Sequence, residues 1–183
     1  KAIPLFSLEL RRLLLSRLTW LIALLTLLSP LAGLTLYKPA SAGTMLSMYL
    51  ANPALAGGAA GGVLFGLLAV FELDRANRCR VDVLVDAAVS PLRMALVRLL
   101  ALMSGAALTL CLAMLVWLPV SRGLIGAVFD GAEYLLAYAL FMGLALPLGI
   151  LAASSAYQFA RRADLSLVAL AVFAGLSLSV WAD

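Results

Sequence analysis

The sequence predicts an all-α integral membrane protein, with an N-terminal helix along the membrane surface followed by about five transmembrane helices. Hydrophobic residues make up 65% of the chain, charged residues make up 12%, and the mean hydropathy is +1.11. A soluble domain has too little interior to bury that much apolar surface. The apolar residues also fall into separate runs, each near the ~20 residues that a helix needs to cross the hydrocarbon core. We therefore expect one transmembrane domain over residues 1–183.

The first element, residues 1–16, is predicted to be an interfacial helix that lies along the membrane before the chain turns in. Phe6 and Leu10 follow helical spacing, whereas the charged Glu9 and Arg11 lie between such apolar positions. An apolar stripe beside charges is typical of helices at the membrane surface. The alternative is that these residues are only the charged start of the first span.

Five apolar runs follow this helix, and each is predicted to be a transmembrane helix. They cover residues 18–37, 51–73, 94–118, 134–157 and 165–181. The last is only just long enough to cross, because spanning helices have about 17 to 25 residues. The loops between them are short apart from 74–92, so no extramembrane domain is expected.

The basic residues predict the orientation of the chain. Of its 13 lysines and arginines, only Lys38 and Arg122 fall on the side of the membrane opposite to the N-terminus. Because basic residues are enriched in cytoplasmic loops, the N-terminus and residues 74–92 should be cytoplasmic.

The second run contains a tandem glycine pattern, with Gly58, Gly62 and Gly66 spaced four residues apart. Such spacing lets another helix backbone approach closely, either within one bundle or at the contact between two subunits. In the fourth run, Pro147 removes a helical hydrogen bond, which predicts a kink, either fixed or acting as a hinge.

The longest polar interruption lies between the second and third runs, and it carries a short amphipathic helix at about Ala76–Val89. The apolar stripe of that helix consists of Val81, Leu84, Val85 and Ala88. This is the spacing of one helical face. Ser90 and Pro91 then end it and start the next helix, since Ser is a good N-cap and Pro fits the first helical position.

Catalytic and metal sites are not expected. The chain has no histidine, and its cysteines, Cys79 and Cys111, lie in different environments without metal-ligand spacing. No acidic residue falls at the centre of a span, and Arg98, about one turn into the third, can reach back to the membrane surface. These absences disfavour an intramembrane enzyme and an ion-coupled pump.

Taken with the N-terminal Glu9–Arg12, the stretch FELDRANRCRVDVLVDAAVSPLRMALVRLLAL (Phe71–Leu102) resembles the first cytoplasmic loop of the ABC-2 family of transporter permeases. In that family, an acidic and basic run leaves the second span, and a short coupling helix, a Ser-Pro-like turn and an apolar third span follow. Two features depart from the family. A Gly-Thr or similar pair usually stands where Asn77–Arg80 stands here, and six spans are usual where we predict five, so that a sixth is absent or lies outside this chain.

The resemblance implies a multi-pass permease subunit of an ABC exporter in a bacterial inner membrane, with no cofactor of its own and no nucleic-acid partner. ATP and Mg would be bound by two ABC ATPase subunits, and a second permease copy or paralogue would complete the pathway for a hydrophobic or amphipathic substrate. The residues implied in coupling to the ATPase are Glu72, Asp74, Arg75, Arg78, Val81, Asp82, Leu84, Val85, Asp86 and Ala88. The alternative is a non-transporting scaffold or assembly subunit of a larger complex.

Overall fold

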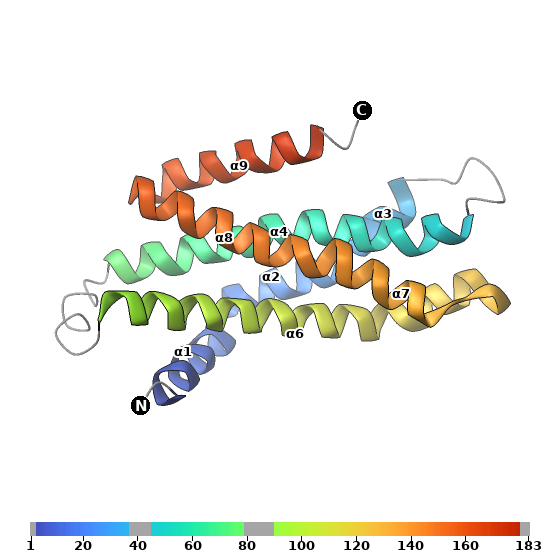
Figure 1. Ribbon diagram of the computed structural model, residues 1–183, viewed down its shortest axis with the longest axis horizontal. Coiled ribbons are helices and arrows are strands. Elements are labelled where there is room, and N and C mark those ends of the chain that lie inside the picture. The colour runs from blue at the N-terminus through green and yellow to red at the C-terminus, as the bar shows by residue number, and fades with distance from the viewer. Residues whose placement is uncertain (1–2, 37–44, 79–89, 180–183) are drawn as a thin grey trace.

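The computed structural model describes residues 3–36, 45–78 and 90–179, and these ranges are helical almost throughout (Figure 1). In chain order the elements are α1 (Ile3–Leu15), α2 (Arg17–Leu28), α3 (Pro30–Leu36), α4 (Met45–Arg78), α6 (Pro91–Ile125), the 3-10 turn η2 (Gly126–Val128), α7 (Gly131–Ala137), the π-helical turn η3 (Tyr138–Met142), α8 (Gly143–Ala160) and α9 (Ala163–Ser179).

Four segments are long and apolar enough to cross a membrane, as expected of a helical membrane protein. They are Arg17–Thr35, Tyr49–Arg75, Leu92–Val128 and Gly131–Ala160. The fifth predicted span corresponds to α9, which is apolar but has only 17 residues. At 1.5 Å per residue, α9 is about 25 Å long, which is a little less than the hydrocarbon thickness of about 30 Å.

The apolar segment of the second span, Tyr49–Arg75, ends close to the predicted span end at Leu73, and helix α4 continues beyond it to Arg78. It therefore includes Ala76, the predicted start of the coupling helix. No glycine or proline stands between Leu73 and Arg78, so nothing interrupts the helical hydrogen bonds when the chain leaves the apolar stretch. The rest of the predicted coupling helix, residues 79–89, lies outside the described residues.

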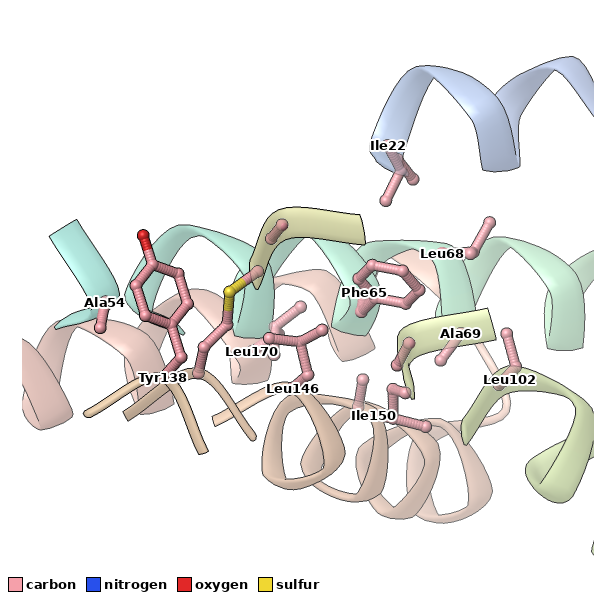
Figure 2. Close-up of a cluster of buried hydrophobic side chains, with 14 of the residues drawn as sticks. Ile22, Ala54, Phe65, Leu68, Ala69, Leu102, Tyr138, Leu146, Ile150 and Leu170 are labelled. Atoms are coloured by element: carbon pink, nitrogen blue, oxygen red, sulfur yellow. The ribbon is translucent and has the colours of Figure 1, made fainter. Parts of the chain in front are cut away.

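Helix α4 is the central element of the bundle, since it contacts α2, α3, α6, α7, α8 and α9. Its side chains Phe65 and Leu68 are fully buried, as are Leu146 and Ile150 of α8. Figure 2 shows these residues in one cluster with Ile22 of α2.

The glycines of α4 lie where α8 and the preceding π turn cross it. A side chain at Gly58 would meet the backbone of Phe141, and a Cβ at Gly62 would lie 2.9 Å from the carbonyl oxygen of Ala145. A Cβ at Gly66 would lie 3.0 Å from the carbonyl oxygen of Gly149. Each step of four residues along α4 therefore matches a step of four residues along η3 and α8. The second and fourth spans therefore run parallel.

The tandem glycines thus pack inside one bundle, which is the first of the two alternatives raised by the sequence. The neighbouring Gly57 and Gly61 face the first span, where they lie against Pro30 and Thr26. Glycine on both of these faces allows α4 to hold two other helices at close range.

The first span is broken at Ser29, between α2 and α3. Pro30 has no N–H, so the carbonyl of Thr26 loses its helical donor. The hydroxyl of Ser29 donates to that carbonyl instead, at 2.7 Å. Next to it, the indole of Trp117 in α6 donates to the carbonyl of Leu27 at 2.8 Å, which ties the break to the third span.

The fourth span is composite, because α7, η3 and α8 follow one another without a gap. Tyr134 and Tyr138 are buried with ring centroids 4.7 Å apart, and the Tyr134 hydroxyl donates to the carbonyl of Met114 in α6 at 2.7 Å. Pro147 lies inside α8, one turn after the π turn ends. It leaves the carbonyl of Gly143 without its usual N–H donor, so the irregular part of this span extends over these two adjoining turns.

The close contact between α4 and α8 makes a first prediction. Gly62→Ala should lower the free energy of unfolding by about 1 to 3 kcal/mol, because the added methyl group meets backbone, which has little freedom to move. Unfolding of the purified protein in mixed detergent micelles, followed by circular dichroism, measures the change.

Gly175→Ala is the matched control, because a Cβ at Gly175 in α9 meets no atom within 4 Å. Removing a helical glycine there should leave the protein as stable or stabilise it by up to about 1 kcal/mol. Equal effects of the two substitutions would show that the contact at Gly62 is not tight.

Candidate functional site

Four charged side chains from three helices meet at one end of the bundle. Glu9 and Arg12 come from α1, Glu72 comes from α4, and Arg98 comes from α6. We call these four residues the ionic cluster. The C-terminal end of α4 and the N-terminal end of α6 lie together at this end of the molecule, with α1 beside them (Figure 1).

Arg12 is the centre of the ionic cluster, because one nitrogen of its guanidinium contacts both carboxylates. Its Nη2 donates to Oε2 of Glu72 at 2.6 Å and lies 3.1 Å from Oε2 of Glu9. Hydrogen bonds between ionised partners are short and are stronger than neutral ones. Arg12 therefore joins the N-terminal helix directly to the end of the second span.

Arg98 supplies the second positive charge. Its Nε lies 3.8 Å from Oε1 of Glu9, and its side chain is only 13% exposed. Arg98 therefore lies beside an acid of α1, a partner that the sequence did not predict. Arg75 is a peripheral neighbour, since it is largely exposed and its Nη1 lies 3.9 Å from Glu72.

The two acids and Arg98 are the least exposed members of the cluster, with side-chain exposures of 11% for Glu9, 9% for Glu72 and 13% for Arg98. Removing one partner of a fully buried pair destabilises proteins by about 3 to 5 kcal/mol. The cost here is smaller, because the Arg12 side chain is 38% exposed. Two carboxylates against two guanidinium groups balance the formal charge within the ionic cluster.

Local structure places α1 so that it reaches this cluster. Ser16 is extended between α1 and α2, which turns the chain sharply. The indole of Trp20 donates to the carbonyl of Leu14 at 2.7 Å across this corner. Leu13, near the C-terminal end of α1, is buried and packs on Gly105 of α6.

The space beside the ionic cluster is too small for an organic ligand. The cavity lined by the four charged residues and by Leu13, Leu73, Ala101 and Leu102 has a volume of about 10 Å³. This is about the least space that holds one water molecule. In the ranges that the structure describes, no group of three acidic or cysteine side chains is placed to hold a metal ion. The ion pairs of the cluster connect α1 to α4 and to α6.

The residues that the sequence resemblance assigned to coupling fall into two groups. Glu72, Asp74 and Arg75 belong to the last turns of α4, and Arg78 is its last residue. Val81, Asp82, Leu84, Val85, Asp86 and Ala88 lie outside the described residues.

Asp74 connects α4 to the fourth span, because the hydroxyl of Tyr157 in α8 donates to its Oδ1 at 3.3 Å. These two residues are 83 positions apart in the chain. The same offset relates Gly58 to Phe141 and Gly62 to Ala145, so the polar contact continues the parallel register of the glycine contact.

Sequence reasoning noticed the charges of Glu9–Arg12 and of Arg98 but did not bring them together with Glu72. One signal was available, since Glu9 is the only acid among the residues that precede Glu72. A lone acid on a helix that is otherwise apolar and basic, near the membrane boundary, needs a cationic partner. The sequence does not say which of the many arginines that partner is.

Comparison of the chain with known protein families, with curated proteins and with solved structures finds no match.

The ionic cluster makes a second prediction. Arg12→Gln and Glu72→Gln should each lower the free energy of unfolding by about 1.5 to 3 kcal/mol, because each removes a charge-assisted hydrogen bond of a largely buried carboxylate. The double variant should be less destabilised than the sum of the two single variants, with a coupling energy of about 0.5 to 3 kcal/mol.

Glu133→Gln is the control, since Glu133 is an exposed acid in the first turn of α7. Its loss should change stability by no more than about 1 kcal/mol. If the effects of Arg12→Gln and Glu72→Gln simply add, the contact between these residues does not stabilise the fold.

Proposed function

We propose that this chain is the membrane subunit of an ATP-driven exporter of the ABC-2 type, in a bacterial inner membrane. Its partners are two cytoplasmic ATPase subunits, which bind ATP and Mg²⁺, and a second copy or paralogue of the permease. Residues 79–89 carry the contact with the ATPase, and the substrate is hydrophobic or amphipathic. The proposal rests on the resemblance of Phe71–Leu102 to the family's coupling loop.

The strongest structural support for this proposal is the way the helices on either side of residues 79–89 are connected. The two helices that flank residues 79–89, α4 and α6, are joined at that same end to α1 through Glu9, Arg12 and Arg98. A displacement of the loop therefore acts on both spans directly and on the N-terminal helix through ion pairs. This is the mechanical connection that a coupling segment needs, and a simple connecting turn would not need it.

The mechanism follows from this arrangement. Binding of ATP draws the two ATPase subunits together and shifts the loop that is docked on them. Since α4 and α6 begin or end at the loop, they move with it, and α8 follows because it packs tightly against α4 along Gly58, Gly62 and Gly66. Work done by the ATPase is thereby passed to three spans at once.

The substrate route lies between two copies of the chain in this proposal. The cavity at the ionic cluster has a volume of only about 10 Å³, which leaves no room for a substrate beside these charged side chains. The glycine face of α4 is covered by α8 and so is not the face that meets the second copy. An apolar route along exposed helix faces suits a lipid-like molecule.

A third prediction tests the coupling role. Leu84→Asp should abolish copurification of the ATPase subunits and ATP-driven transport, because it places an unpaired charge in an apolar contact, which costs several kcal/mol, roughly 2 to 5. Both readouts are measured in the same membranes, with insertion of the permease checked separately.

Leu92→Asp is the matched control. Leu92 lies in the first turn of α6, is 73% exposed and stands outside the predicted apolar stripe. An acid in the first turn of a helix is favourable, so this variant should insert, bind the ATPase and transport normally. If Leu84→Asp behaves like this control, the segment does not couple to an ATPase, and the scaffold alternative becomes the better explanation.

A fourth prediction concerns orientation. In a Cys111→Ser variant, Cys79 is the only cysteine, and it lies in the segment proposed to be cytoplasmic. A thiol reagent that does not cross membranes should label it in permeabilised cells and leave it unlabelled in intact ones. Labelling in intact cells would place the loop outside, where no ATPase subunit meets it.

A further inference from the structure

The outer face of α1 combines apolar and basic side chains that no described part of the protein covers. Leu8 and Leu15 are 63% and 73% exposed, and Arg11 is exposed between them. Residues 8, 11 and 15 are separated by three and four positions, so they project from one side of the helix. The opposite side of α1 carries Leu13, which is buried against α6.

The charges of this region divide between the two sides of α1. Arg12 turns inward to Glu72, and the single acid of α1, Glu9, is taken by Arg12 and Arg98. Arg11 and Arg17 make no ion pair with any residue that the structure describes, and the first turn of α2, which starts at Arg17, has no acid. Two positive charges therefore face outward without an anionic partner among the residues that the structure describes.

The corner between α1 and α2 indicates how deep the outer face of α1 lies in the membrane. Trp20 is 58% exposed, and its indole is held by the carbonyl of Leu14, so its ring stays beside the corner. The residues after Arg17 belong to the first segment that can cross the membrane, Arg17–Thr35. Amphipathic indole rings favour the level of the lipid headgroups, so Arg11 and Arg17 lie at about that level as well.

We propose that the outer face of α1, together with Arg17 at the start of α2, is a binding surface for anionic phospholipids, in which Leu8 and Leu15 enter the acyl boundary and Arg11 and Arg17 bind headgroup phosphates. The inference goes beyond the proposed transport function and does not depend on it. A helix that lies along the membrane surface holds its apolar side chains in the outer part of the acyl layer and its basic ones among anionic headgroups. The uncompensated charge of the two arginines matches such a surface.

A lipid surface fits this face better than a protein partner does. The exposed apolar residues described on this face, Leu8 and Leu15, are aliphatic and lie about two helical turns apart with Arg11 between them, so these two do not form one continuous apolar patch for a protein contact. The face also begins at the membrane boundary, where lipid is already present at high concentration.

Trp20 is a local reporter for the test. A full-length Trp117→Phe, Trp181→Phe variant, with thermal unfolding like that of the wild type, is placed in lipid nanodiscs that contain brominated phosphatidylglycerol or brominated phosphatidylcholine at the same mole fraction. Bromine quenches indole fluorescence on contact, so the ratio of quenching gives the preference for the anionic lipid near Trp20. We expect clear preference for phosphatidylglycerol at low salt, and a decrease of this preference as salt is added.

The arginines are then changed in this background. Arg11→Gln with Arg17→Gln should abolish the preference for phosphatidylglycerol. Each arginine is expected to contribute about fivefold to it, which is the effect of one basic residue near an anionic surface. Arg11→Lys with Arg17→Lys should keep most of it. The control is Arg161→Gln with Arg162→Gln, which removes equal charge from the turn between α8 and α9, on the other side of the bundle from α1 (Figure 1); it should leave the preference unchanged.

Two results would overturn the proposal. One is equal quenching by the two lipids in the starting variant, which would mean that no anionic lipid gathers at this corner. The other is a preference that survives Arg11→Gln with Arg17→Gln, or that falls equally with Arg161→Gln and Arg162→Gln, since the attraction would then come from the charge of the whole protein.

Discussion

The close contact between α4 and α8 is the constraint on which the rest of the bundle depends. In a bilayer, lipid tails are as apolar as leucine side chains, so burying leucine gives little reason for two helices to associate. Close packing of small residues replaces that driving force. Gly58, Gly62 and Gly66 let the backbone of α8 and its preceding π turn approach α4, and no larger residue fits at these points without movement.

The register set by the glycines has consequences at the far end of the same helices. The constant offset of 83 residues brings Tyr157 opposite Asp74, where the tyrosine hydroxyl donates to the carboxylate. It also places Gly149 opposite Gly66, and at this same point Leu170 of α9 packs on Gly66, so the last helix contacts the pair there. A parallel pair of spans with one continuous register moves as a unit more readily than two spans joined by scattered contacts.

The ionic cluster solves a different problem at the membrane boundary. Glu9 and Glu72 are largely buried, and each carries a charge that is costly outside water. Pairing with Arg12 and Arg98 makes these charges tolerable and at the same time holds α1 against the bundle. Each carboxylate would destabilise a helix end that stood alone. In the cluster, the ion pairs of these carboxylates connect α1, α4 and α6.

Much of the architecture was predictable from the sequence, and the failures have identifiable causes. The apolar runs predicted the helical membrane class, and four of them correspond to helices long and apolar enough to cross a membrane. The predicted span end at Leu73 lies close to the end of the apolar segment Tyr49–Arg75, but helix α4 continues to Arg78, because hydropathy reports where the apolar stretch stops whereas a helix continues until its hydrogen bonding is interrupted. The break at Ser29 was not predicted, and the hydrogen bond from Trp117 to Leu27 beside it could not be, because it joins residues 90 positions apart in the chain.

By itself, the sequence determined that the chain is helical and apolar, which of its helices carries a close-packing face, and where its charges are concentrated. Only the tertiary structure decided that the glycine face of α4 meets α8, and that Glu9 meets Arg98 and Arg12 meets Glu72. The reason is physical. Helices such as α8 are apolar all round, because both the interior and the surrounding lipid accept apolar side chains, so hydrophobic periodicity does not tell the inner face from the outer one. Contacts between helices then follow from their crossing geometry, which no single helix encodes.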